Sequence, residues 1–312
     1  MVSRCRVKQP PDWKEYEQEI VDYFRSEYPQ AKITPDARLI GKFSKVARQI
    51  DLLVEDQASD FTLKIAVDAK HYADRIDVKD VEQFLGLLRD VGVDVGVMIA
   101  PEGYSQAAIN RAHYDDSRLE LDVLNFKELK FFQGFGAIPF SGDVGVAMPA
   151  PFGWVIDARK SPNWAACLYQ RGVSLEDAMN AHEWMYVNFS KRDERWSDLE
   201  SLLKVQEIYM TDGKPGAKIT FLDPIRREDG RKTIVRRYEH PSYPGPEFTG
   251  FVEFERFIFF CVLFTPAELE EKNLRKLRYI VRRVLPLGIR YKSKDASKNQ
   301  RSERVQGPDT QG

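Results

Sequence analysis

Two short apolar segments separated by a polar turn constrain the fold of this chain most strongly. Residues 50–54 and 61–67 have the length and apolar content of β-strands, and residues 55–60 between them are polar. We therefore expect a β-hairpin here. Downstream, apolar segments of strand length alternate with helical patterns, which is typical of an α/β sheet with helices packed against it.

The rest of the first half completes such a domain. A polar stretch around residues 32–41 separates an opening helix from the hairpin. The other expected elements are helices at residues 13–28, 78–90, 105–114 and 126–132, and strands at residues 95–100 and 119–124. We place this α/β domain at residues 1–140.

Glycine and proline cluster between residues 134 and 153, which favours a linker or boundary. The region from residue 141 to 290 then predicts an α+β domain. Its expected helices are residues 164–170, 175–188, 196–206 and 266–285, and its expected strands are residues 154–157, 217–222, 232–239 and 248–264, the last one long and bent. Residues 291–312 are rich in Ser, Lys, Gln and Gly and predict a disordered basic tail.

Charge and cysteine content exclude several classes of protein. Lys plus Arg is 47 and Asp plus Glu is 48, so the chain is no wholly basic nucleic-acid binder, although a local basic groove remains compatible. Cys5, Cys167 and Cys261 lie far apart without a CxxC pair, which disfavours a disulfide framework or a zinc site. The longest apolar run, residues 257–264, is too short to span a bilayer. We expect a soluble cytoplasmic protein.

Three charged residues at the hairpin carry the chemistry. Asp51 begins one strand and Asp68 ends its antiparallel partner, so both carboxylates can lie at the same rim, and Lys70 shares a face with Asp68. Two neighbouring carboxylates suit Mg²⁺ or Mn²⁺, which can activate water for attack on a phosphodiester. Lys70 can orient that water or stabilise the charged transition state. The same spacing also fits a solvated salt bridge at a strand edge, and spacing alone leaves both readings open.

Residues 13–132 resemble the Mrr-like branch of the PD-(D/E)xK nuclease superfamily. The matching segments, in order, are an opening helix with Tyr16 and Glu17, RQIDLLVE, KIAVDAKHY, VEQFLGLLRDVGVD and VGVMIAPEGYSQAAINRA. The resemblance implies the restriction-endonuclease fold, a mixed sheet flanked by helices. It also implies metal-dependent hydrolysis of phosphodiester bonds in DNA.

The resemblance assigns roles to individual residues. Asp51 matches the first metal-binding acid, Asp68 and Lys70 match the acid and lysine of the motif, and Ala69 between them is a further metal-binding position. The remaining matches are Glu17 on the first helix and Gln83 on the helix after the motif. The implied cofactor is Mg²⁺, with Mn²⁺ as a substitute.

The chain also departs from the family pattern. Ile50 stands where many members have glycine, Asp68 where many have glutamine, and Leu87 where the helix often carries tyrosine. These departures blur the subfamily and leave the catalytic set complete.

The second half offers two weaker signals. Twelve basic residues lie between Lys272 and Arg304, and those on the expected helix predict contacts with DNA phosphates: Arg275, Arg278, Arg282 and Arg283. A solvated helix and tail is the alternative. Four tryptophans suit either a base-stacking cage or, more simply, ordinary core and surface positions: Trp154, Trp164, Trp184 and Trp196.

Together these observations predict a Mg²⁺-dependent DNA endonuclease that restricts foreign or modified DNA. The second domain would supply target recognition, dimerisation or contact with other defence proteins, and cleavage of both strands favours a homodimer. Two alternatives remain. One is a repair or recombination nuclease that acts on branched DNA, and the other is a binding or assembly protein that uses the nuclease fold as a scaffold.

Overall fold

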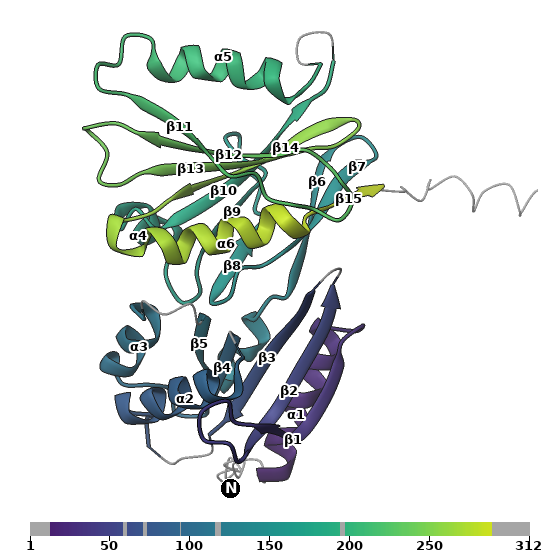
Figure 1. Cartoon of the computed structure of the whole chain (residues 1–312), viewed down its shortest axis with the longest axis vertical. Helices are drawn as coiled ribbons and strands as arrows, with labels where there is room; N and C mark the ends of the chain where they lie inside the picture. Colours follow the sequence, from purple (N-terminus) through teal and green to yellow (C-terminus); the bar gives the residue numbers. More distant parts are fainter. Residues whose placement is uncertain are drawn as a thin grey trace, which may run out of the picture.

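The computed structural model describes residues 13–58, 61–70, 74–93, 95–115, 120–193 and 197–288. Figure 1 shows an N-terminal region, residues 13–131, and above it a strand-rich C-terminal region, residues 135–288. The expected tail at residues 291–312 lies outside the described residues. Among the described residues, no helix combines the length and apolarity needed to cross a membrane.

A five-stranded mixed sheet forms the centre of the N-terminal region, in the order β1-β2-β3-β4-β5. The strands are β1 (Lys32–Ile40), β2 (Ala47–Ala58), β3 (Phe61–Ala69), β4 (Val95–Ala100) and β5 (Glu120–Asn125). The first three are antiparallel neighbours, and β3, β4 and β5 run parallel. We call the edge where these three parallel strands begin the amino edge, and the edge where they end the carboxyl edge.

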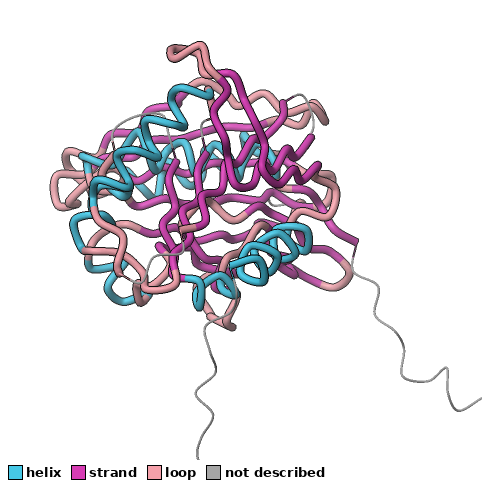
Figure 2. The backbone as a smooth tube through the Cα atoms, turned by 90° about the horizontal axis from the view of Figure 1, so that it is seen from below, coloured by secondary structure: helices cyan, strands magenta, loops and turns pink. Residues whose placement is uncertain are grey.

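Helices cover both faces of this sheet. Helix α1 (Trp13–Glu27) buries Tyr16 and Phe24 against one face, beside the short 3-10 helix η1 (Phe126–Phe131). Helices α2 (Val78–Val91) and α3 (Gln106–His113) bury their apolar sides against the other face. Figure 2, seen from below, shows helices on both sides of the strands. The expected α/β fold, a mixed sheet flanked by helices as in restriction endonucleases, is confirmed.

The hairpin is confirmed as β2 and β3, but the sheet has a strand that we did not expect. The polar stretch around residues 32–41 forms β1 and pairs with β2 from Lys32↔Glu55 to Ile40↔Ala47. Because β1 is an edge strand and largely exposed, its sequence lacks the apolar alternation that identifies half-buried strands.

The C-terminal region is built on a seven-stranded antiparallel sheet in the order β11-β12-β13-β14-β10-β9-β8. Its strands are β8 (Trp154–Asp157), β9 (Ala166–Gln170), β10 (Trp184–Lys191), β11 (Lys218–Leu222), β12 (Thr233–Glu239), β13 (Glu247–Glu253) and β14 (Phe257–Phe264). The helices of this region are α4 (Leu175–Asn180), α5 (Leu199–Thr211), the 3-10 helix η2 (Ala267–Leu269) and α6 (Glu270–Arg283). The expected α+β character holds, with more strands than the sequence predicted.

Helices α5 and α6 pack on opposite faces of this sheet (Figure 1). Gly250 on β13 allows α6 to approach closely. A Cβ atom at this position would lie 2.4 Å from the Val281 side chain, which is too close for any other residue. A three-stranded sheet of β6 (Phe135–Ser141), β7 (Val144–Pro149) and β15 (Leu285–Gly288) completes the region.

Several expectations for this half were wrong. Residues 164–170 were expected to be helical, but they contain strand β9. The helix expected at residues 175–188 ends at Asn180 and is followed by β10. Strand β9 is buried along almost its whole length, and a short apolar run without alternation does not distinguish a strand from a helix.

The strand expected at residues 248–264 is two strands, β13 and β14, joined by a tight turn in which Phe254 N donates to Phe257 O at 2.9 Å. The stretch rich in glycine and proline is no open linker, because it contains the β6–β7 hairpin, whose first strand includes residue 140. The division of the chain near that residue stays a prediction.

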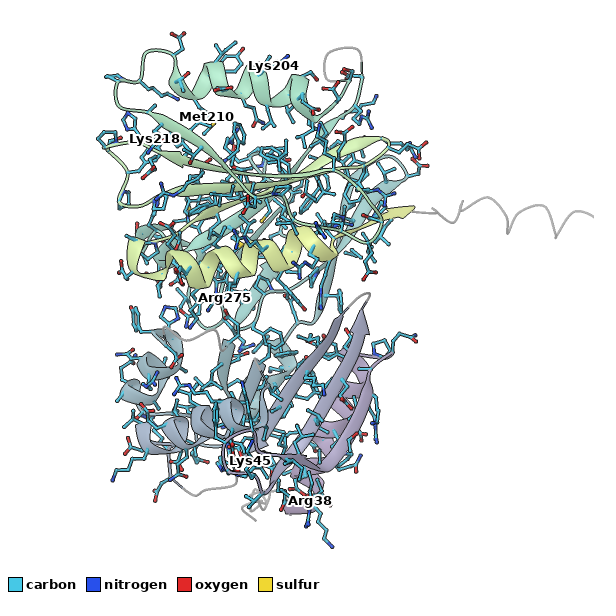
Figure 3. All side chains as sticks on the ribbon, in the orientation of Figure 1. Arg38, Lys45, Lys204, Met210, Lys218 and Arg275 are labelled. Carbon is cyan, nitrogen blue, oxygen red and sulfur yellow. The ribbon has the colours of Figure 1, made fainter. Side chains whose placement is uncertain are left out.

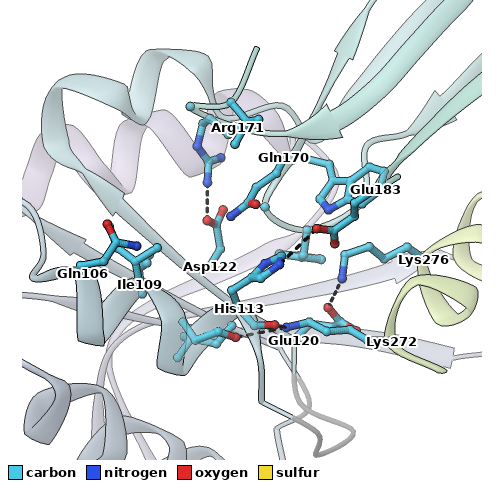
Figure 4. Close-up of a pocket in the computed structure, with 18 residues that line it drawn as sticks. Gln106, Ile109, His113, Glu120, Asp122, Gln170, Arg171, Glu183, Lys272 and Lys276 are labelled. Carbon is cyan, nitrogen blue, oxygen red and sulfur yellow. Dashed lines mark hydrogen bonds and ion pairs between the residues drawn. The ribbon is translucent and has the colours of Figure 1, made fainter. Parts of the chain in front are cut away.

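The two regions meet along α6 and the amino edge. Lys276 Nζ pairs with Glu120 Oε2 at 2.6 Å, and Lys272 Nζ donates to the main-chain oxygen of Ala112 at 3.1 Å. A buried ion pair joins Arg171 to Asp122. These groups line a cavity of about 390 Å³ between the regions (Figure 4). The amino edge is therefore occupied by contacts between the two regions.

Candidate active site

The register of the β2–β3 hairpin brings Asp51 and Asp68 together. Leu52 pairs with Val67, so Asp51 and Asp68 are the next opposed positions toward the carboxyl edge. Asp51 Oδ2 accepts a hydrogen bond from Ala69 N at 2.8 Å, which fixes the carboxylate beside the end of β3. The predicted meeting of the two acids at one rim is therefore what the fold produces.

Lys70 completes this group. Its Nζ lies 3.1 Å from Asp68 Oδ1, and both side chains are largely shielded from water. The second carboxylate oxygen, Asp68 Oδ2, is buried and has no hydrogen-bond partner among the residues that the structure describes. Burial raises the pKa of Asp68 to about 6, with Lys70 acting to lower it and Asp51 to raise it further. The site thus holds a carboxylate with an unsatisfied oxygen.

Helix α1 supplies the next residues. Burial, followed by the nearby charges of Asp51 and Asp36, raises the pKa of Glu17. Tyr16 donates its hydroxyl proton to the main-chain oxygen of Ile99 at 3.2 Å, at the end of β4. The sequence placed Glu17 at the site through family resemblance, and the structure brings it beside Asp51.

Asp36 is a site residue that sequence reasoning missed. It lies on β1 between the pairs Pro35↔Leu52 and Ala37↔Ile50, with a left-handed φ of 49°. With Glu17, Asp51 and Ala69 it lines a cavity of about 40 Å³, which has room for a small ligand such as one water molecule. The missing signal was β1 itself, because only a strand at residues 32–40 puts Asp36 opposite Asp51.

Gln83 makes no hydrogen bond or ion pair with this group that the described residues show. It is exposed on α2, one turn after Asp80, and the charge of Asp80 contributes to the raised pKa of Asp68. A role for Gln83 stays a prediction, and Asp80 is the α2 side chain whose charge reaches the site.

The donor set fits a divalent cation held partly by water. Among the described residues, no group of three or more His, Cys, Asp and Glu side chains is arranged to hold a metal by itself. Asp51 and Asp68 provide two carboxylates, and Ala69 can add its main-chain oxygen. The unpartnered Asp68 Oδ2 is the kind of buried oxygen that a cation would satisfy.

Several cations of the basic helix α6 are less exposed than the sequence predicted. Lys272, Lys276 and Arg283 are buried, and Arg275 Nη2 lies 3.3 Å from Glu120 Oε1 across the boundary between the regions. Only Arg278 and Arg282 of the four predicted DNA-contacting arginines are exposed. The sequence pattern showed the apolar side of α6. It did not show that the N-terminal region covers part of the polar side, and so it did not predict that these cations are buried. Phosphate contact by these arginines is untested, and the place of α6 at the amino edge makes a large part in binding DNA at the carboxyl edge unexpected.

The tryptophans do not form one cage. Trp154 is buried in the core under α6, whereas Trp164 and Trp184 belong to a separate aromatic cluster with Tyr186 and Phe264. Trp196 lies outside the described residues. Trp154 and Trp184 are therefore core tryptophans, as the simpler of the two interpretations predicted.

Comparison with known proteins identifies the N-terminal region. Residues 11–130 match the family model of the Mrr_cat restriction endonuclease domain. No curated protein matches the chain.

Similar solved structures cover parts of the chain. The DNA modification-dependent restriction endonuclease AspBHI matches with 14% identity and a TM-score of 0.24, over 41% of this chain and 37% of its own. MspJI restriction endonuclease, solved with a 27-mer oligonucleotide, matches with 14% identity and a TM-score of 0.25, over 41% of this chain and 34% of its own. Cyanobacterial PsbP (CyanoP) from Synechocystis sp. PCC 6803 matches with 14% identity and a TM-score of 0.34, over 49% of this chain and 92% of its own.

The chain thus spans little more than a third of the two endonucleases that it resembles. The motif segments, the mixed sheet and the family match agree on the same part of the molecule. Residues 11–130 are an Mrr-like restriction endonuclease domain of the PD-(D/E)xK superfamily.

Proposed function

We propose that the chain is a metal-dependent endonuclease that hydrolyses phosphodiester bonds in DNA. The observation that carries this proposal is the convergence of Asp51, Asp68 and Lys70 at the carboxyl edge, where the buried Asp68 Oδ2 has no hydrogen-bond partner among the described residues. Such an oxygen alone does not mark a cation site, because Asp122 Oδ2 of the Arg171–Asp122 pair is also buried without a partner among those residues. At the carboxyl edge it lies beside a second carboxylate, Asp51, and a cation shared by the two acids would offset the cost of about 1–3 kcal/mol for an unpaired buried atom.

Mg²⁺, with Mn²⁺ as a substitute, would be held by Asp51, Asp68 and the main-chain oxygen of Ala69. When bound, the ion would lower the pKa of a water molecule and neutralise charge on the phosphate. Around it, the chain's own groups have separate tasks. Lys70 is positioned to orient the attacking water and to stabilise negative charge on the phosphate oxygens. Glu17, with its raised pKa, can take up the proton that this water releases.

The proposed reaction balances as a hydrolysis. The water oxygen forms a bond to phosphorus, the bond from phosphorus to the departing strand end breaks, and that oxygen takes a proton from solvent. Tyr16 contributes by fixing the main chain at the carboxyl edge through its hydrogen bond to Ile99 O. It therefore acts as a positioning residue.

The biological setting belongs to the same proposal. Membership of the Mrr-like family supports restriction of foreign or modified DNA in the cytoplasm, as part of defence, by a homodimer with one site per chain. The C-terminal region, proposed at residues 141–290, would recognise the target, dimerise or contact other defence proteins. Its seven-stranded sheet and its own apolar core support a separate task for it.

The test is a cleavage assay on plain, methylated and branched duplexes with Mg²⁺, with Mn²⁺ and with EDTA. We expect cleavage that EDTA abolishes, together with a preference for one duplex class. Asp51→Asn and Asp68→Asn preserve side-chain shape, and both should abolish cleavage and weaken Mn²⁺ binding measured by calorimetry. Cleavage that persists in EDTA would overturn the metal mechanism.

The two alternative functions predict different results in this assay. Preference for branched duplexes would favour a repair or recombination nuclease. Absence of cleavage and of Mn²⁺ binding would favour a scaffold that has kept only the fold.

A further inference from the structure

The turn between β1 and β2, residues 41–46, exposes an unusual set of side chains. Phe43 is 70% exposed, and Ile40 and Val46 beside it are 69% and 55% exposed. Large apolar side chains gathered at one exposed point mark a surface that contacts something. We call residues 41–46 the β1–β2 turn.

The β1–β2 turn is built as a rigid element. Asp90, a buried residue of α2, accepts hydrogen bonds from Phe43 N and Ser44 N, both at 2.9 Å. Its other oxygen pairs with Arg48 Nη1 at 2.8 Å. A Cβ atom on Gly41 would lie 2.5 Å from Asp90 Oδ2, so glycine is needed for this close approach. Phe43 is therefore held outward by its fixed main chain.

The exposed charges of the β1–β2 turn are positive, because the neighbouring carboxylate of Asp90 is buried and paired with Arg48. Lys42 and Lys45 are exposed within the turn, Arg38 is exposed on β1, and residues 41–46 contain no carboxylate. Lys42 Nζ lies 5.4 Å from the centre of the Phe43 ring. Two copies of this surface would repel each other, whereas a polyanion would be attracted.

The β1–β2 turn lies near the candidate active site. From Asp51 the chain runs back seven residues to Ser44, or about 23 Å if fully extended. Along α2, Asp80 near the site and Asp90 under the turn are ten residues apart, or about 15 Å. The turn is therefore about 15–20 Å from the acids, a distance equal to roughly five or six base pairs at 3.4 Å each.

The basic helix α6 lies at the opposite edge of the sheet. Figure 3 shows Arg38 and Lys45 at the end of the molecule away from the C-terminal region, and Arg275 at the boundary between the regions. Glu120 on β5, which contacts α6, pairs with Val95 on β4. Val95 in turn pairs with Ile65 on β3. Ile65 precedes Lys70 by five residues, or about 16 Å. DNA seated at the carboxyl edge thus meets the β1–β2 turn before it meets α6.

We propose that the β1–β2 turn enters the minor groove of duplex DNA beside the active site. Phe43 would press against a base step as an apolar wedge, and Lys42 and Lys45 would contact the flanking phosphates. Apolar wedges carried by basic elements are an established way to unstack a step and bend a duplex toward the protein. This inference rests on the proposed function, and it adds the element that grips the DNA.

The first experiment tests the wedge by comparing Phe43→Ala with a matched control, Phe131→Ala. Phe131 is also exposed, at 55%, and it also has a lysine near its ring, with Lys130 Nζ at 5.0 Å. Duplex affinity is measured by fluorescence anisotropy in EDTA, where no cleavage occurs. We expect Phe43→Ala to weaken binding roughly tenfold, in line with the value of one base stacked on an aromatic ring, and Phe131→Ala to have no effect.

A second readout follows the bases themselves. 2-Aminopurine placed at successive steps should brighten at one step when wild-type protein binds, because unstacking removes its quenching. Phe43→Ala should lose that signal. Since Phe43 is mostly exposed, thermal unfolding of the variant should match that of the wild type.

The second experiment tests the cations with Lys42→Ala/Lys45→Ala. Each phosphate contact releases a counterion, so the slope of log affinity against log salt should fall by about 1.8 for two lost contacts. The double variant should weaken binding to all sequences alike.

The outcomes separate the two proposals. If the wild type binds and cleaves DNA while both variants keep wild-type affinity and slope, the inference is overturned and the proposed function stands. A change of oligomeric state in Phe43→Ala with unchanged DNA affinity would make the turn an interface between copies, which also overturns it. If the wild type neither binds nor cleaves DNA, both proposals fail.

Discussion

The two edges of the five-stranded sheet arrange their charges differently. At the carboxyl edge, four acids lie close together, Glu17, Asp36, Asp51 and Asp68, and Asp68 pairs with Lys70. At the amino edge, Glu120 is matched by Lys276 and Arg275, and Lys272 donates to main-chain oxygens.

The difference separates two uses of buried charge. Paired charges at the amino edge join the two regions of the chain. At the carboxyl edge, burial and then the charge of Asp51 raise the pKa of Asp68 against the opposing effect of Lys70, and such an excess of acids is what a site that binds a cation would show.

Among the substitutions that compare the two edges, Lys70→Ala should have the largest effect, which is on catalysis. Both carboxylates remain, so Mn²⁺ affinity should be kept while the cleavage rate falls ~10²-fold or more, because the group that stabilises the charged phosphate is lost. Single-turnover cleavage and calorimetry on the same preparation measure the two quantities. Turnover equal to the wild type would show that Lys70 is a salt-bridge partner only, and the carboxyl edge would then resemble the amino edge.

At the amino edge, Glu120→Gln should lower the free energy of unfolding by about 2–3 kcal/mol. Lys276, which is 6% exposed, would keep its charge without its partner, and leaving a buried charge unpaired is costly. Chemical denaturation measures the change. Asp143→Asn is the control, because Asp143 and Arg256, which pair at 2.9 Å, are both exposed and such pairs contribute little. Equal effects of the two substitutions would remove the distinction that we draw for this edge.

Asp68→Asn should act in the opposite direction and stabilise the metal-free chain, by about 1–2 kcal/mol at pH 8. The folded pKa of about 6 lies above the ordinary value of 3.8, so the folded form binds more protons between these values. Wild-type stability should therefore rise as the pH falls from about 6 to about 4, and the advantage of Asn should shrink over the same range.

Asp157→Asn is a control that should change the free energy of unfolding in the opposite direction. Hydrogen bonds from Arg159 lower the pKa of Asp157 to about 2, so this substitution should destabilise the chain at neutral pH. Denaturation at several pH values tests both variants. A loss of stability in Asp68→Asn at pH 8 would contradict the view that the cost of burying Asp68 exceeds the stabilisation by Lys70.

The smallest effect concerns α6. Arg278→Ala/Arg282→Ala removes the two exposed arginines of the four that the sequence singled out, and we expect at most a ~twofold loss of duplex affinity with an unchanged salt slope. The reason is their place at the far edge from Asp68. A loss as large as that expected for Lys42→Ala/Lys45→Ala would show that DNA reaches both edges.

The core of the site was predictable because it depends on one hairpin. Once residues 50–54 and 61–67 are recognised as antiparallel strands, the meeting of Asp51 and Asp68 follows from register alone. Asp36 was not predictable in this way. Its strand is exposed and carries Pro35, and its own φ is left-handed, so neither alternation nor propensity identifies it.

The C-terminal region was harder for a different physical reason. Strands β9, β13 and β14 are buried almost throughout, which removes the alternation that marks a strand. The helix face of α6 was read correctly as apolar, but its cations were read as free. Their partners, Glu120 and Ala112, lie 156 and 160 residues earlier in the chain, at a separation that local patterns do not encode.

The placement of α6 also sets an order in time. The five-stranded sheet is complete at Asn125, while α6 ends at Arg283, about 160 residues later. At the usual pace of ~5–20 residues per second, synthesis of the intervening chain takes roughly 10–30 s. Until Arg171 is made, Asp122 lacks its partner. Until Lys276 is made, Glu120 lacks its partner as well. An N-terminal region that folds as it is synthesised therefore does so with its amino edge open, and α6, the last helix of the described residues, closes that edge.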